Sequence, residues 1–131
     1  NILALAENLV LSGIGMTIAG NSAPASGAEH MIAHYLESKG KLNSLHGEAV
    51  GVFAIITAKM QQMYFCRGQV EKTALKIYKL LKNVGCKTNY QQLNLKKEDV
   101  KDAIKNAKHT RNRYTILNIE TPACPVMHDY I

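Results

Sequence analysis

The sequence has few of the cysteines that hold small domains together. Cys66, Cys86 and Cys124 are odd in number and widely spaced, and they include no Cys-x-x-Cys pair. This pattern favours neither a disulfide framework nor a thiolate zinc site. We therefore expect a protein of a reducing compartment, the cytoplasm, whose fold is held together by packing alone.

The chain also lacks the common nucleotide and nucleophile motifs. No Gly-x-Gly-x-x-Gly follows a strand pattern, because Gly13-Ile14-Gly15 lies in an apolar, helix-like context, and no Gly-x-Ser-x-Gly elbow occurs. Cys66 has no evident base partner. Cofactor-binding residues therefore stay unknown at this point.

Length and charge narrow the class of protein. A chain of 131 residues can form one domain with a real core, but it is too short for most two-domain nucleotide-dependent oxidoreductases. A net charge of +6 could attract nucleic acid, an anionic membrane or phosphorylated small molecules. Most lysines, however, lie between Lys72 and Lys108 among apolar residues at helical spacing, as on a solvated helix face. We expect no nucleic-acid partner.

The first 20 residues are the most apolar part of the chain. Glu7, Asn8 and Ser12 interrupt this stretch and no basic segment precedes it, so we expect neither a membrane span nor a signal peptide. The chain begins with Asn1 rather than Met, directly within a helix-like run. We interpret residue 1 as a cut rather than a natural beginning.

Helical periodicity dominates, and no strand alternation extends beyond a few residues, which predicts an all-α fold. Helices are predicted over residues 2–19, 24–38, 45–65, 69–83 and 97–107. The third is apolar on more than one face and should be the central buried helix. Residues 111–118 are expected to be extended or to form a short turn, and the end of the chain, from Pro122, to be a loose tail.

Three of the five histidines lie close together in the sequence. His30 and His34 are four residues apart, on one face of the second helix, and His46 lies in the first turn of the third. Two imidazoles and a carboxylate can bind a metal and leave a position open for substrate. Alternatively, His30 and His34 are partly buried residues satisfied by hydrogen bonds. His30 lies roughly 12 Å before the end of its helix. A tight antiparallel hairpin would therefore not bring His46 beside His30. For the two to meet, the second and third helices must cross at an angle or the connection must run back along the second helix.

The residues beside these histidines have two interpretations each. Ser26 and Gly27 precede His30 at a helix start, whose free amides could hold a phosphate or hydroxyl group of a substrate. Equally, they could be a first turn of small residues that permits close packing. Glu48 is favoured as a first-turn acid over a second role, that of orienting an imidazole.

Three stretches resemble the C-terminal domain of the glycerol-1-phosphate dehydrogenase family. They are Ser22-Ala23-Pro24-Ala25-Ser26-Gly27-Ala28-Glu29-His30 with His34, Leu45-His46-Gly47-Glu48-Ala49-Val50-Gly51, and Arg111-Asn112-Arg113-Tyr114-Thr115-Ile116-Leu117. The His-Gly-Glu piece is shared with glycerol dehydrogenases, iron-containing alcohol dehydrogenases and dehydroquinate synthases, whereas the other two point to the narrower family. The chain departs at Ala23, where that family usually has arginine.

The resemblance implies a two-domain enzyme in which residues 1–131 form the helical, metal- and substrate-binding domain. An N-terminal domain absent from this chain would bind NAD(H) or NADP(H). His30 and His46 would bind Zn²⁺ or Fe²⁺ with an aspartate expected upstream of Asn1, and His34 would be the catalytic residue in the substrate pocket, near Ser26 and Gly27. The metal would act as a Lewis acid while hydride passes between the nicotinamide and dihydroxyacetone phosphate, glycerol-1-phosphate or a similar polyol.

Two other functions stay open. One is a dehydroquinate synthase-like lyase that uses the same metal centre, and the other is a helical module that binds metal or an anionic partner without catalysis. The 131-residue chain alone is expected to be inactive. A surface normally covered by the other domain could also make it self-associate, so a homo-oligomer stays open.

Overall fold

The computed structural model describes residues 1–65 and 71–119, and these residues form helices and loops without a strand. The α-helices are α1 (Ile2–Ala19), α2 (Ala28–Ser38), α3 (His46–Phe65), α4 (Glu71–Asn83) and α5 (Lys97–Asn106). Four single turns of 3₁₀-helix are η1 (Ala23–Ala25), η2 (Gln91–Leu93), η3 (Ala107–His109) and η4 (Ile116–Asn118). The all-α prediction is confirmed.

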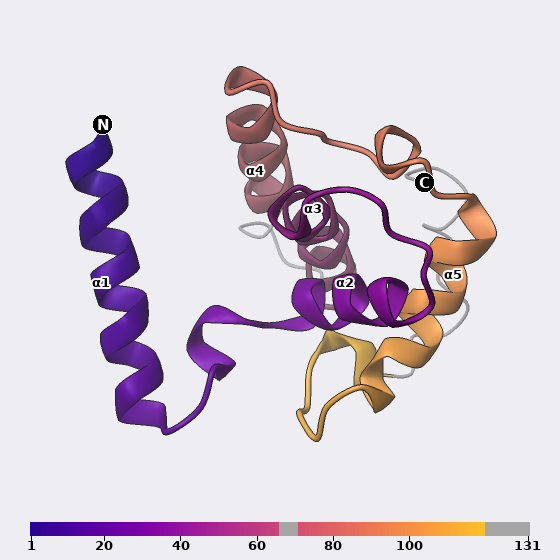
Figure 1. Cartoon of the computed structure of the whole chain (residues 1–131), viewed down its shortest axis with the longest axis horizontal. Helices are drawn as coiled ribbons and strands as arrows, with labels where there is room; N and C mark the ends of the chain where they lie inside the picture. The colour runs from indigo at the N-terminus through magenta and orange to yellow at the C-terminus, as the bar shows by residue number, and fades with distance from the viewer. Residues whose placement is uncertain (66–70, 120–131) are drawn as a thin grey trace.

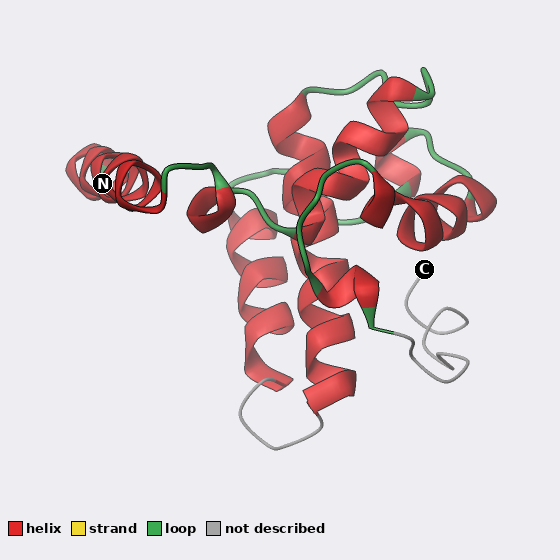
Figure 2. Ribbon diagram, turned by 90° about the horizontal axis from the view of Figure 1, so that it is seen from below, coloured by secondary structure: helices red, strands yellow, loops and turns green. Residues whose placement is uncertain are grey.

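The core lies where α2 and α3 meet. Met31 and Ile32 of α2 and Phe53 of α3 are fully buried. Helix α4 packs against α3, while α5 and η3 pack against α2 (Figure 2). Helix α3 is thus the central helix, as its apolar faces predict, and the first turns of α2 and α3 are fixed to a rigid core.

Helix α3 crosses α2 instead of running back antiparallel to it. In Figure 1 α3 is seen nearly end-on above α2, and the connection between them runs back over α2 before α3 begins. The reversal starts at Gly40, whose φ of +64° suits glycine, and the Lys41 amide closes the end of α2 by donating to the Leu36 carbonyl at 2.9 Å. The expectation that the two helices cross at an angle or the connection runs back is confirmed.

The predicted start of the second helix, residue 24, is wrong, because α2 begins at Ala28. Pro24 belongs to η1, and Ser26 is extended, with φ −147° and ψ 95°. The Gly27 amide, the first that a longer helix would use internally, donates instead to the Glu29 carboxylate at 2.7 Å. The interruption leaves Ser26 and Gly27 in a turn directly before α2.

The other predicted bounds agree with the observed helices to within one or two residues. The fifth helix ends at Asn106 rather than at residue 107, and η3 continues the chain. Residues 111–118 combine an extended stretch with the η4 turn. The predicted start of the fourth helix at 69–70 and the predicted tail lie outside the described residues.

Helix α1 projects from the side of the bundle (Figure 1) and buries none of its residues. Its large apolar side chains are exposed, and they are Ile2, Leu3, Leu5, Leu9, Val10, Leu11, Ile14 and Ile18. The helix is long and apolar enough to cross a membrane by length and composition. Core helices of soluble proteins and signal sequences meet the same criterion. That α1 is neither a membrane span nor a signal peptide therefore stays a prediction.

Candidate functional site

The fold brings the three predicted histidines together. His30 and His34 extend from one face of α2, and His46 is the first residue of α3. The ring centroids are 5.4 Å apart for His30 and His46, 4.7 Å for His34 and His46, and 6.4 Å for His30 and His34. Their side chains are 24%, 37% and 39% exposed in chain order, so a ligand can reach the cluster.

Each imidazole contacts a carboxylate through its Nδ1 atom. His30 Nδ1 lies 2.9 Å from Glu29 Oε1. Glu37 serves two rings, because its Oε2 lies 3.0 Å from His34 Nδ1 and its Oε1 lies 2.7 Å from His46 Nδ1. One carboxylate in the third turn of α2 therefore joins the second helix to the start of the third.

The environment keeps both carboxylates ionised. Burial by itself would raise the pKa of Glu29 and of Glu37, but the hydrogen bonds from the histidines, and for Glu29 also from backbone amides, outweigh it and hold both pKa values below the ordinary 4.5. An ionised carboxylate only accepts hydrogen bonds, so each Nδ1 must donate. In a neutral imidazole this leaves the Nε2 lone pair free to bind a metal or a proton.

The donor set fits a divalent zinc or iron ion. Two imidazoles on one tetrahedral zinc, with Zn–N bonds of about 2.0–2.1 Å, have ring centroids roughly 5 Å apart. His30 and His46 meet this spacing at 5.4 Å, and His34 and His46 also come near it at 4.7 Å. Spacing alone therefore fits a metal at His46 without choosing the second imidazole.

A second ligand combination is His34, Glu37 and His46, whose ligand atoms all lie within 4.8 Å of one another. The Glu37 contacts of 2.7 and 3.0 Å have the length of charge-assisted hydrogen bonds. Glu37 thus has the geometry of an acceptor that orients the rings. If one of its oxygens bound a metal, that oxygen would have to share or give up its hydrogen bond to the histidine.

Glu37 was not among the residues predicted from the sequence. Glu48 was considered instead as a residue that could orient an imidazole. Glu48 is a first-turn acid of α3, as favoured, and its carboxylate pairs with Lys87 Nζ at 2.9 Å rather than with a histidine. The signal for Glu37 was its position three residues after His34 and seven after His30, on the same helix face. Its contact with His46 depends on the reversal at Gly40.

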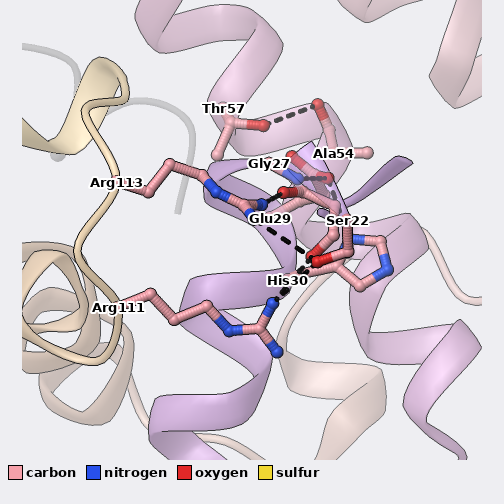
Figure 3. A network of polar contacts seen from close by, with 9 residues as sticks. Ser22, Gly27, Glu29, His30, Ala54, Thr57, Arg111 and Arg113 are labelled. Atoms are coloured by element: carbon pink, nitrogen blue, oxygen red, sulfur yellow. Dashed lines mark hydrogen bonds and ion pairs between the residues drawn. The ribbon is translucent and has the colours of Figure 1, made fainter. Parts of the chain in front are cut away.

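The structure places Ser26 and Gly27 beside the histidine cluster, within four residues of His30. Ser26 is buried, and the Gly27 amide is occupied by Glu29. Because a Cβ at Gly27 would lie 2.8 Å from Glu29 Oε2, glycine permits this close approach. Ser26 is also contacted by two arginines from much later in the chain, Arg111 and Arg113. Figure 3 shows both arginines beside Ser22.

Comparison with known proteins gives the same family as the motifs. No family model matches the chain. The glycerol-1-phosphate dehydrogenase (NAD(P)+) of Aeropyrum pernix is 42% identical over 114 residues, which are 86% of this chain and 30% of that protein. The resemblance to the glycerol-1-phosphate dehydrogenases is confirmed. The enzymes of the same name from Nitrosopumilus maritimus and Archaeoglobus fulgidus are 40% and 34% identical, over 86% and 93% of this chain.

The chain spans about a third of the length of these curated relatives, with 30%, 30% and 34% of each covered. The glycerol-1-phosphate dehydrogenases it matches are, by name, NAD(P)-dependent oxidoreductases. The matches extend over 114, 114 and 123 residues of this chain's 131. The function of the cluster is therefore best considered within this family.

Proposed function

We propose that this chain is the metal- and substrate-binding domain of an NAD(P)-dependent dehydrogenase that interconverts dihydroxyacetone phosphate and glycerol-1-phosphate, or a similar polyol. The observation that carries the proposal is the cluster of three imidazoles, each with Nδ1 held by a carboxylate and Nε2 left free. A further domain would bind most of the NAD(H) or NADP(H). The cytoplasm is the proposed location.

His30 and His46 are the proposed metal ligands, together with an aspartate from outside this chain. Their spacing of 5.4 Å supports this pair, and the resemblance selects it over the pair that contains His34. Two imidazoles and a carboxylate suit Zn²⁺ or Fe²⁺. Such an ion, when bound, supplies a Lewis acid that stabilises negative charge on the substrate oxygen.

His34 is the proposed catalytic residue. Its ring stacks on that of His46 at 4.7 Å, and its Nδ1 proton is donated to Glu37. The Nε2 atom can therefore accept the proton of a substrate hydroxyl when the alcohol is oxidised and return it in the opposite direction. Glu37, whose Oε2 lies 3.0 Å from Nδ1, would keep the ring oriented with Nε2 toward the substrate during this transfer.

Glu29 and Glu37 are the proposed positioning residues of this site. Each fixes which ring nitrogen carries the proton and limits rotation of the ring. Glu29 acts on His30 alone, whereas Glu37 acts on His34 and His46 together. The metal ligands and the proton-transfer residue thus share one oriented network along α2.

Metal analysis of a His46→Ala variant of the complete enzyme tests the proposal directly. Metal content measured after purification is expected to fall close to zero, because two ligands cannot hold the ion as tightly as three. His109→Ala is the matched control, since His109 is exposed at the end of η3, outside the cluster. Unchanged metal content in the His46 variant would remove this residue from the site.

A steady-state assay separates the dehydrogenase from a lyase with the same metal centre. Dihydroxyacetone phosphate should consume NADH or NADPH in stoichiometric amounts when the complete enzyme is used. A lyase of the dehydroquinate synthase type would show no net nicotinamide turnover with this substrate. The names of the similar proteins favour the first result.

A further inference from the structure

Two arginines converge on the turn that precedes α2 (Figure 3). Arg111 Nη1 donates to Ser22 Oγ and to Ser26 Oγ, each at 3.4 Å. Arg113 Nη2 donates to Ser22 Oγ at 3.3 Å, and Arg113 Nη1 donates to the Ser26 carbonyl. Both arginines lie between η3 and η4, more than 80 residues along the chain from the serines.

Among the residues that the structure describes, the two guanidinium groups have only neutral partners. Within residues 1–65 and 73–119, the carboxylates in ion pairs are Glu29, Glu37, Glu48 and Asp99, and their partners are histidines and lysines. Neither arginine is exposed, so two positive charges are partly removed from water without an opposite charge. Such a pair attracts an anion.

The remaining hydrogen-bond capacity suits a phosphate group. Each guanidinium has five N–H donors in a planar fork, of which these contacts use only one or two. Ser22 and Ser26 accept from the arginines through Oγ, so both hydroxyl protons are left to donate. Two forks and two hydroxyls are the donors that a dianionic phosphate binds.

We infer that Arg111, Arg113, Ser22 and Ser26 bind the phosphate group of the substrate. The inference rests on the proposed function, because it names the part of the site that recognises a phosphorylated substrate. Ser26 precedes His30 by four residues, and the Glu29 carboxylate connects the two by accepting from the Gly27 amide and from His30. The phosphate subsite therefore adjoins the metal-binding histidines.

The two arginines have different parts in this subsite. Arg113 also holds the backbone of the turn through the Ser26 carbonyl, so its loss would disturb local structure. Arg111 makes only two long contacts with hydroxyls, and it can turn toward a phosphate without releasing the backbone. Among the described residues drawn around this turn in Figure 3, the carboxylate is that of Glu29, and its single negative charge is outweighed by the two guanidinium groups.

Titration of inorganic phosphate into the metal-free protein, followed by calorimetry, tests the subsite without any contribution from the metal. The variants are Arg111→Gln, which keeps a donor but removes the charge, and Ser22→Ala, which leaves the turn backbone intact. Lys105→Gln is the control, because it removes one positive charge from the exposed end of α5. Loss of a charged hydrogen bond is expected to weaken phosphate binding about tenfold or more in Arg111→Gln.

The expected result is weaker phosphate binding in Arg111→Gln and Ser22→Ala, unchanged binding in Lys105→Gln, and normal metal content in all three. Equal phosphate affinity in Arg111→Gln and Lys105→Gln would overturn the inference. If Arg111→Gln fails to fold in a thermal unfolding check, Ser22→Ala decides. A different pair of results would refute the proposed function alone, namely that phosphate still binds while His46→Ala retains its metal. The phosphate subsite would then stand without the proposed metal site.

Discussion

If the proposed metal site is correct, Glu37 should control the affinity for zinc, because it is proposed to orient the metal ligands rather than to be one of them. Replacing it with glutamine removes one of the two acceptors, because the amide oxygen can serve one imidazole while the NH₂ group faces the Nδ1–H of the other. Because two donors facing each other repel, that ring turns away or its proton moves from Nδ1 to Nε2. If the affected ring is His46, its Nε2 no longer presents a lone pair to the ion.

The expected size follows from the contacts. Removal of a carboxylate that orients a metal-binding histidine commonly reduces metal affinity about 10- to 100-fold, which corresponds to about 1.4–2.7 kcal/mol. Glu37 is 34% exposed, so water can replace part of its effect. We therefore expect Glu37→Gln to lie near the lower limit and Glu37→Ala, which loses both contacts, to lie nearer the upper one.

The assay is a competition titration of zinc against a chelating indicator. Glu48→Gln is the matched control, because Glu48 is 30% exposed, lies in the adjacent helix and pairs with Lys87 instead of a histidine. Equal zinc affinity in the two variants would refute the orienting role. A loss in Glu37→Gln as complete as that in His46→Ala would make Glu37 a ligand, in the combination with His34 and His46.

Three further predictions concern the scaffold. Phe53→Ala should lower the free energy of unfolding by about 3–5 kcal/mol, measured by denaturant titration, because the ring is fully buried in α3; a loss below about 1 kcal/mol would show that the core collapses around the gap. Gly27→Ala should weaken metal binding because its Cβ would displace the neighbouring carboxylate, whereas Gly47→Ala, with no atom in the way, should not. Asp99 accepts from the Lys96 amide and pairs with the Lys41 ammonium, and these contacts hold its pKa below the ordinary 3.8. The ionised Asp99 carboxylate therefore stabilises the fold above the ordinary pKa, and this stability is lost as the pH falls through the lower pKa of the folded protein. Melting temperatures of Asp99→Asn should therefore vary less with pH in this acid range, and identical profiles would contradict the assignment.

The sequence predicted what depends on local spacing. Helical periodicity gave the helices, and the four-residue step from His30 to His34 gave one face of the site. The position of His30 in its helix also predicted that, for His46 to reach that face, the helices must cross or the connection must run back. The start of α2 was wrong because Pro24 is compatible with a first helical turn, whereas the Glu29 carboxylate competes for the Gly27 amide and delays the helix.

Contacts over long separations were out of reach of such patterns. Glu37 touches His46 only because the chain reverses at Gly40, and nothing in the local sequence tells how far that reversal carries α3 over α2. Arg111 and Arg113 were recognised as part of a family motif, but their partners lie in the turn before α2. Their lack of a charged partner follows from the ion pairs of the described residues, whose carboxylates pair with histidines and lysines instead.

The two halves of the proposed site should fail independently, because they are built in different ways. His30, His34 and Glu37 lie on a single helix, so the part of the proposed metal site that this chain supplies needs only α2 and the first residue of α3 to be in place. The phosphate subsite joins the turn before α2 to the distant segment that contains Arg111 and Arg113. None of the hydrogen bonds formed by these two arginines reaches one of the three histidines. Loss of Arg111 should therefore leave metal binding intact, whereas displacement of Glu29, which accepts from both the Gly27 amide and His30, should affect both halves together.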